Sequence, residues 1–237
     1  MDELSFDEIK NIEYSILREV AQFCDSHGIR YYLVCGTLLG AVRHNGFIPW
    51  DDDIDIGMPR PDYERFIKEF ASAEYVLHDN SIDGRYPYAF AKVSDPKTEL
   101  TEEIELPFPM GVYIDIFPID GVPENAKKQK KFFRRIAWDM RLLSWKRISK
   151  KKKVGTVHKI LQIIAKILLK PVPMEKIVKR LDKDVKKYPY DAASLVGHFV
   201  TKANWGSDIK PKEIFGTNSP SITSIWIISA PPSTILF

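Results

Sequence analysis

The segment Trp50–Ile56 (WDDDIDI) alternates acidic and apolar residues along the chain. Side chains of a β-strand point alternately to its two faces. We therefore expect a strand over Asp52–Gly57. The carboxylates of Asp51, Asp53 and Asp55 would share one face, and the isoleucines between them would enter the core. Three carboxylates on one face repel one another unless a cation joins them, so the pattern predicts a divalent-cation site. A solvated acidic turn is the alternative.

Two other segments carry related signals. Gly36-Thr37 follows an apolar stretch and begins a helical pattern, so its backbone N–H groups and hydroxyl can hold a phosphate. The segment Val112–Asp120 (VYIDIFPID) sets Asp115 between apolar neighbours. A buried acid on a strand needs a partner. That partner is either the same divalent cation or a positively charged side chain that forms a salt bridge in the core. A calcium loop starting at Asp51 is excluded, because its sixth position is isoleucine and its twelfth is aspartate.

The composition excludes several other classes of protein. The chain has 237 residues, of which 44% are hydrophobic and 28% charged, as in a folded globular protein. Its acidic start (MDELSFDEIK) lacks the apolar stretch of a signal peptide. Two cysteines and five scattered histidines do not make a disulfide framework or a zinc site. We therefore expect a cytoplasmic protein.

The expected elements divide the chain into an α/β front half and a helical back half. A capping box at Ser5 and Glu8 begins the first helix, and Gly28 ends it. Expected strands are 30–35, 52–57, 75–77, 89–93 and 112–117; expected helices are 37–45, 61–71, 124–148, 156–170, 174–187 and 192–200. We assign residues 1–123 to a catalytic core, 124–213 to a helical basic region, and 214–237 to an uncharged tail.

The stretch Gly36–Phe66 (GTLLGAVRHNGFIPWDDDIDIGMPRPDYERF), with Ile114–Asp120 (IDIFPID), closely resembles the LicD family of phosphocholine-type transferases, which includes the fukutin-related proteins. The resemblance covers about residues 5–216, and its specific motifs lie between 36 and 120. It implies an α+β, nucleotidyltransferase-like fold with a mixed sheet flanked by helices. It also implies transfer of a phospho-alcohol, such as phosphocholine, from a CDP-activated donor to a cell-surface glycan (lipopolysaccharide, teichoic acid or capsule).

The resemblance also assigns site residues. The resemblance makes Asp53 and Asp55 the pair that binds Mg²⁺, with Mn²⁺ as a substitute. Asp115 becomes the third acid, and all three residues are expected to be both metal-binding and catalytic. Gly36 and Thr37 match the phosphate-side turn of the donor site.

Four further residues belong to the same motifs. Asp51 either helps to bind metal or acts as the base for the acceptor. Arg43 is a candidate clamp for the diphosphate, with pairing to the acidic run as its alternative. Lys92 would neutralise the leaving nucleotide. His44 is a candidate base, although we favour a structural hydrogen bond.

The back half separates charge strongly. Residues 126–170 hold 16 lysines and arginines and one acid, whereas the rest of the chain carries a net charge of −12. Amphipathic segments over 127–170 suit either a helical bundle or peripheral contact with the inner face of a membrane, where a lipid-linked acceptor would lie. Nucleic acid is not an expected partner, because no recognition motif accompanies the charge.

Two other functions remain open, and the tail bears on one of them. The last 24 residues carry no charge, and from Thr217 they depart from the family pattern, as a frameshift or a truncation would produce. An inactive binding module is therefore one alternative. The other is a nucleotidyltransferase, which would release pyrophosphate instead of CMP.

Overall fold

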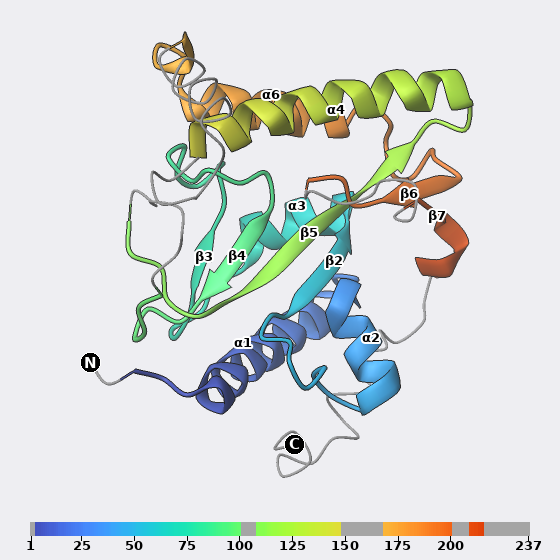
Figure 1. Ribbon diagram of the computed structural model, residues 1–237. Coiled ribbons are helices and arrows are strands. Elements are labelled where there is room, and N and C mark those ends of the chain that lie inside the picture. The colour runs from blue at the N-terminus through green and yellow to red at the C-terminus, as the bar shows by residue number, and fades with distance from the viewer. Residues whose placement is uncertain (1–2, 101–107, 148–167, 201–208, 216–237) are drawn as a thin grey trace.

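The computed structural model describes residues 3–100, 108–147, 168–200 and 209–215 (Figure 1). In this part of the chain, seven strands form one curled mixed sheet with helices packed around it, which is an α+β architecture. The strands are β1 (Tyr32–Leu33), β2 (Asp55–Pro59), β3 (Val76–His78), β4 (Ala91–Ser94), β5 (Tyr113–Val122), β6 (Leu195–Gly197) and β7 (Lys210–Pro211). The helices are α1 (Phe6–His27), α2 (Cys35–His44), α3 (Arg60–Glu69), α4 (Ala126–Arg147) and α6 (Met174–Val185), followed by the 3₁₀ turn η1 (Lys212–Phe215).

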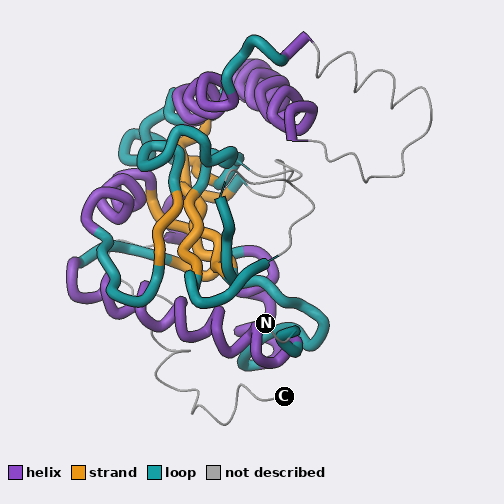
Figure 2. The backbone as a smooth tube through the Cα atoms, turned by 90° about the vertical axis from the view of Figure 1, so that its left-hand side faces the viewer, coloured by secondary structure: helices purple, strands orange, loops and turns teal. Residues whose placement is uncertain are grey.

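The long strand β5 organises the sheet. The strands follow the order β1-β2-β5-β4-β3, and β6 and β7 extend the sheet from the far end of β5. β5 pairs in parallel with β2 and antiparallel with β4 and β6. Helices α1 and α2 lie at one end of the sheet and α4 and α6 at the other, with β5 running between them (Figures 1 and 2).

The two faces of the sheet have different apolar cores. Ile56, Ile114 and Ile116 pack in one cluster with residues of α1 and α3. Phe117, on the opposite face of β5, packs in a second cluster with residues of α4 and α6. Because side chains alternate along β5, Asp115 points to the same face as Phe117.

Helix α1 begins and ends as its sequence predicts. Ser5 and Glu8 form both hydrogen bonds of a capping box, and Gly28 adopts the left-handed conformation with φ of 61°. The buried face of α1 includes two charged residues, Lys10 and Glu13, whereas the apolar side chain of Phe6 is exposed. The buried residues of α1 are Lys10, Glu13, Ile16, Leu17, Val20, Ala21 and Cys24.

Three expected elements differ clearly from the structure. The strand expected over 30–35 is limited to Tyr32–Leu33, because Cys35 already belongs to α2. The strand expected over 52–57 begins only at Asp55, so Asp51 and Asp53 lie in the loop before β2. The helix expected over 192–200 is wrong, since Leu195–Gly197 forms β6 and pairs with β5. Residues 156–167 of the helix expected over 156–170 and the tail from Thr217 lie outside the described residues. Within the described residues, no helix is both long and apolar enough to cross a membrane.

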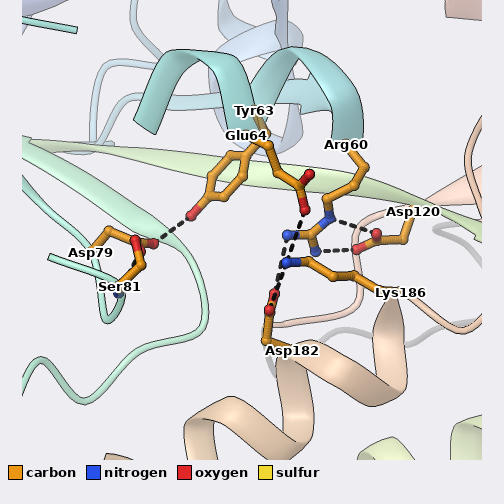
Figure 3. Close-up of polar contacts among 8 residues, drawn as sticks. All are labelled: Arg60, Tyr63, Glu64, Asp79, Ser81, Asp120, Asp182 and Lys186. Carbon is orange, nitrogen blue, oxygen red and sulfur yellow. Dashed lines mark hydrogen bonds and ion pairs between the residues drawn. The ribbon is translucent and has the colours of Figure 1, made fainter. Parts of the chain in front are cut away.

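A buried arginine connects α3, β5 and α6 (Figure 3). The Arg60 guanidinium donates to both carboxylate oxygens of Asp120, at 2.7 and 2.6 Å, and to Asp182 at 3.1 Å. Lys186 pairs with Asp182 and with Glu64. Beside this network, a pocket of about 450 Å³ opens between α3, the loop after β3, and α6. Asp120 points to the opposite face of β5 from Asp115.

Candidate active site

Three neighbouring strands bring two acids and a lysine together. The strand register places Asp55 of β2 beside Asp115 of β5, and Asp115 beside Lys92 of β4. The ammonium nitrogen of Lys92 lies 2.5 Å from Asp115 Oδ1. Lys92 is only 3% exposed. Asp115 therefore has a salt-bridging partner within the sheet, while Asp55 lies next to this pair and is 9% exposed.

The loop before β2 holds the other acids against helix α2. The Asp51 carboxylate lies over Gly36, where a Cβ atom would come within 2.5 Å of Asp51 Oδ2. The negative charge of Asp51 acts on the neighbouring carboxyl group of Asp53. Asp53 is exposed. Asp51 and Asp53 therefore lie in the loop that leads into β2, whereas Asp55 and Asp115 lie side by side on neighbouring strands. We call Asp51, Asp53, Asp55 and Asp115 the acidic site.

Thr37 fixes this loop to the start of α2. Its hydroxyl oxygen accepts the backbone N–H of Asp55 at 2.8 Å and donates to the carbonyl oxygen of Asp53 at 3.4 Å. The buried hydroxyl thus orders the acidic loop, a role that differs from the phosphate contact expected from sequence. The backbone N–H groups at this end of α2 have no side-chain cap. An uncapped helix N-terminus favours anions.

Two of the four acids have raised pKa values. Partial desolvation of its carboxyl group and the neighbouring charges of Asp51 and Asp115 raise the pKa of Asp53 to about 6. Burial and the charges of Asp53 and Asp115 raise the pKa of Asp55 to about 7, although the Cys35 thiol donates to Asp55 and partly offsets this effect. Both carboxylates therefore lack sufficient compensation for their negative charge.

The remaining motif residues lie elsewhere on α2. Arg43 and His44 are exposed in its last turn, at the opposite end from Gly36 and Thr37. The structure therefore does not bring Arg43 to the phosphate-side turn. Among the described residues, no ion pair joins Arg43 to the acidic run.

The chemistry of the acidic site fits a divalent cation held partly by substrate. Within the described residues, no group of three or more histidine, cysteine, aspartate or glutamate side chains lies close enough together to hold a metal on its own. Mg²⁺ is commonly bound by one or two carboxylates, with substrate phosphates and water completing its shell. Asp53 and Asp55, with their raised pKa values and oxygen donors, match that requirement.

Sequence reasoning missed one acid near this site. Glu13 on α1 is 4% exposed, and the charges that act on it belong to Asp53, Asp52 and Asp115. Burial, reinforced by these charges, raises the pKa of Glu13 to about 9. Its spacing from Leu17 and Val20 places it on the core stripe of α1, and that spacing is the signal that could have found it.

Gly36 and Gly40 provide a test of the packing between α2 and the acidic loop. A Cβ at Gly40 would meet backbone atoms, Gly46 O at 2.5 Å and Ile48 N at 2.9 Å, whereas one at Gly36 meets only the end of the Asp51 side chain. We expect Gly40→Ala to cost about 1–3 kcal/mol of unfolding free energy. Gly36→Ala should leave the melting temperature nearly unchanged but displace Asp51. Thermal unfolding of both variants measures this contrast, and equal losses would contradict it.

The raised carboxyl pKa values predict how stability depends on pH. Asp53 and Asp55 titrate near 6 and 7 in the folded chain, above the ordinary value of 3.8. Between about pH 4 and pH 7 the folded state therefore binds more protons than the unfolded state, so the free energy of unfolding falls as pH rises. A cation bound to these carboxylates would reverse the loss. We expect the rise in melting temperature caused by Mg²⁺ to grow from about pH 5 to pH 8. A Mg²⁺ effect that is equal at both pH values would contradict this expectation.

Comparison with known proteins gives the class to which this site belongs. Residues 28–142 match the family described as LicD/FKTN/FKRP, nucleotidyltransferase domain. The matched residues include α2, the acidic loop, the strands β2, β3, β4 and β5, and most of α4.

Individual relatives agree with that class. The chain is 33% identical over 224 residues to the lipopolysaccharide cholinephosphotransferase LicD of Haemophilus influenzae, covering 91% of this chain and 81% of the relative. It is also 48% identical over 46 residues to human ribitol 5-phosphate transferase FKRP, covering 18% of this chain and 9% of that protein. The chain belongs to the LicD family of phosphotransferases.

Proposed function

We propose that this chain transfers a phospho-alcohol, phosphocholine or a similar group, from a CDP-activated donor to a cell-surface glycan. The observation that carries the proposal is the acidic site at an uncapped helix N-terminus, in a chain that matches a lipopolysaccharide cholinephosphotransferase over nearly its whole length. A helix N-terminus beside carboxylates with raised pKa values suits a diphosphate and a divalent cation together. The fold would then be a variant of the nucleotidyltransferase domain.

Asp53 and Asp55 would hold the cation, Mg²⁺ with Mn²⁺ as a substitute. When bound, such a cation supplies charge neutralisation for the donor diphosphate and for the negative charge that develops during transfer. Asp115 would support the site from its place beside Asp55. Its ion pair with Lys92 keeps a positive charge in the same region, where it would favour the leaving nucleotide.

The reaction itself requires positioning more than covalent chemistry by the protein. An acceptor hydroxyl oxygen forms a bond to the phosphorus of the phospho-alcohol, while the bond from that phosphorus to the CMP oxygen breaks. The hydroxyl proton passes to a carboxylate, for which we propose Asp51, which lies in the loop before β2 and over Gly36 of α2. The backbone N–H groups of Gly36 and Thr37 would orient the donor phosphates.

Product analysis tests this function. Incubation with CDP-choline or CDP-ribitol, Mg²⁺ and a glycan acceptor should release CMP with at least one of the donors. Release of pyrophosphate would instead indicate nucleotidyl transfer. Stabilisation by donor without any product, in folded protein, would indicate a binding module.

An anionic surface is the proposed setting for the acceptor. Helix α4 exposes Lys127, Lys128, Lys130, Lys131 and Arg134. Trp138 on the same helix is 52% exposed, and basic residues with an exposed indole suit a membrane interface that carries a lipid-linked glycan. We expect vesicles containing anionic lipid to carry the wild-type chain in flotation, and the Lys130→Gln/Lys131→Gln variant to bind them less. Equal flotation of both proteins would contradict this contact.

A further inference from the structure

A histidine that follows β6 lies against the long strand β5. Strand β6 pairs with β5 and places Gly197 opposite Asp120, so the next residue, His198, returns over β5. The imidazole of His198 stacks on the ring of Phe117, with the two centroids 5.4 Å apart. Phe117 and Asp115 point to the same face of β5, so His198 lies on the sheet face that carries the acids of β2 and β5.

The same imidazole contacts the first residue of α2. His198 Nε2 lies 3.7 Å from Cys35 Sγ, within hydrogen-bond distance for sulfur. The residues around Cys35 enclose Asp55, because the backbone N–H of Val34 donates to the Asp55 carbonyl oxygen at 3.1 Å and the Thr37 hydroxyl accepts the Asp55 N–H at 2.8 Å. His198 is therefore joined, through Cys35, to the part of α2 that borders the acidic site.

This position is accessible to a ligand of the site. Cys35 is exposed and His198 is half-buried. Gly36, the residue after Cys35, belongs to the uncapped N-terminus of α2, where we place the donor phosphates. An imidazole at this point can therefore reach a phosphate that the backbone N–H groups of α2 hold.

The contact with Cys35 is one that a phosphate can replace. In the tautomer with a proton on Nε2, the imidazole donates to a thiol sulfur, which is a weak acceptor. A hydrogen bond to an ionised phosphate oxygen is about twice as strong as one between neutral groups. The stacking on Phe117 restrains the ring plane in both cases, so a small movement suffices to exchange one acceptor for the other.

We propose that His198 binds a phosphate of the donor, with its Nε2–H passing from the Cys35 sulfur to a phosphate oxygen beside Gly36. The inference rests on the proposed function only in placing a diphosphate at this end of α2. His198 lies outside the residues 28–142 that match the family, and it reaches the site because β6 pairs with β5.

Binding of CDP and of inorganic pyrophosphate to the full chain tests this contact. Isothermal titration with Mg²⁺ present compares the wild type, His198→Ala, His198→Gln and His27→Ala. His27 is the matched control, because it also stacks on a phenylalanine, Phe23, but it is exposed at the end of α1. We expect His198→Ala to weaken both ligands about 10- to 100-fold, as the loss of one hydrogen bond to a charged group predicts. His198→Gln, which keeps an N–H donor, should recover part of this loss, and His27→Ala should bind as the wild type does.

The outcomes separate this inference from the proposed function. Wild-type affinities in folded His198→Ala would overturn the phosphate contact and leave the proposed function standing. Failure of both His198 variants to fold would assign the imidazole a structural role instead. Pyrophosphate binding that depends on His198, without binding of CDP, would support the contact and remove the CDP donor. If the wild type bound neither ligand, the contact would fall together with the diphosphate site.

Discussion

Replacing Asp53 by asparagine is expected to lower kcat/KM for CDP-choline by about 10²- to 10³-fold, because it removes charge stabilisation from the centre of the acidic site. Asparagine keeps the size of the side chain, and Asp53 is exposed, so the fold should persist. Since the pKa of Asp53 is raised in the folded state, the chelated variant should melt at the same temperature as the wild type or slightly higher. CMP release and thermal unfolding of the same preparations measure both effects.

Asp52 provides the matched control for Asp53. It is the preceding residue, it is exposed, and Asp52→Asn removes the same unit of charge. We assign it no contact with donor or cation, so its kcat/KM should stay within a few-fold of the wild type. Equal losses in the two variants would mean that the total charge of the loop, and not the position of Asp53, determines activity.

Replacing Asp120 by alanine is expected to cost about 3–5 kcal/mol of unfolding free energy. Asp120 is 1% exposed and takes two hydrogen bonds from Arg60, so the variant leaves a buried guanidinium without its main partner. Asp182 also pairs with Arg60 and is more exposed, so we expect a loss near the lower end of that range. Urea unfolding of the chelated proteins measures it.

An exposed ion pair provides the comparison. Arg65 and Glu69 pair on the surface of α3 at 3.3 Å, so Glu69→Ala should cost less than about 0.5 kcal/mol. If Asp120→Ala lost no more than Glu69→Ala, then Arg60 would not connect α3, β5 and α6 as Figure 3 shows.

The positions of helices and strands could be predicted from the sequence where short-range interactions determine them. Ser5 and Glu8 form a capping box within one turn, so they fix the start of α1 without help from the rest of the chain. The helix after Gly36 and the strand around Asp115 also lie close to their expected positions. In each case the deciding contacts are a few residues apart.

The acidic loop shows why the remainder could not be predicted. The alternation of acids and isoleucines is consistent with a strand from residue 52, yet β2 begins at Asp55. The Thr37 hydroxyl binds the backbone at Asp53 and Asp55, and Lys10 binds the carbonyl oxygens of the preceding loop. These partners are distant in sequence, and they keep the residues before Asp55 out of the β-ladder.

Long-range pairing explains the other differences. Residues 195–197 form a strand because β5 offers them an edge more than 70 residues earlier in the chain. Arg60 lies between two prolines, a context that indicates a helix start and gives no sign of its pairing with Asp120. Glu13 is a polar residue in an amphipathic helix, and only the heptad spacing with Leu17 and Val20 indicates that it is buried.

The most direct measurement follows both products of the transfer at once. Labelled choline phosphate is traced from CDP-choline to the glycan while CMP is quantified, with Mg²⁺ or with chelator, for the wild type and for Asp53→Asn. We expect one CMP for each labelled group transferred by the wild type, and neither product from the chelated protein. Pyrophosphate with a cytidylyl group on the acceptor, or CMP release without label on the glycan, would contradict transfer of the phospho-alcohol by this site.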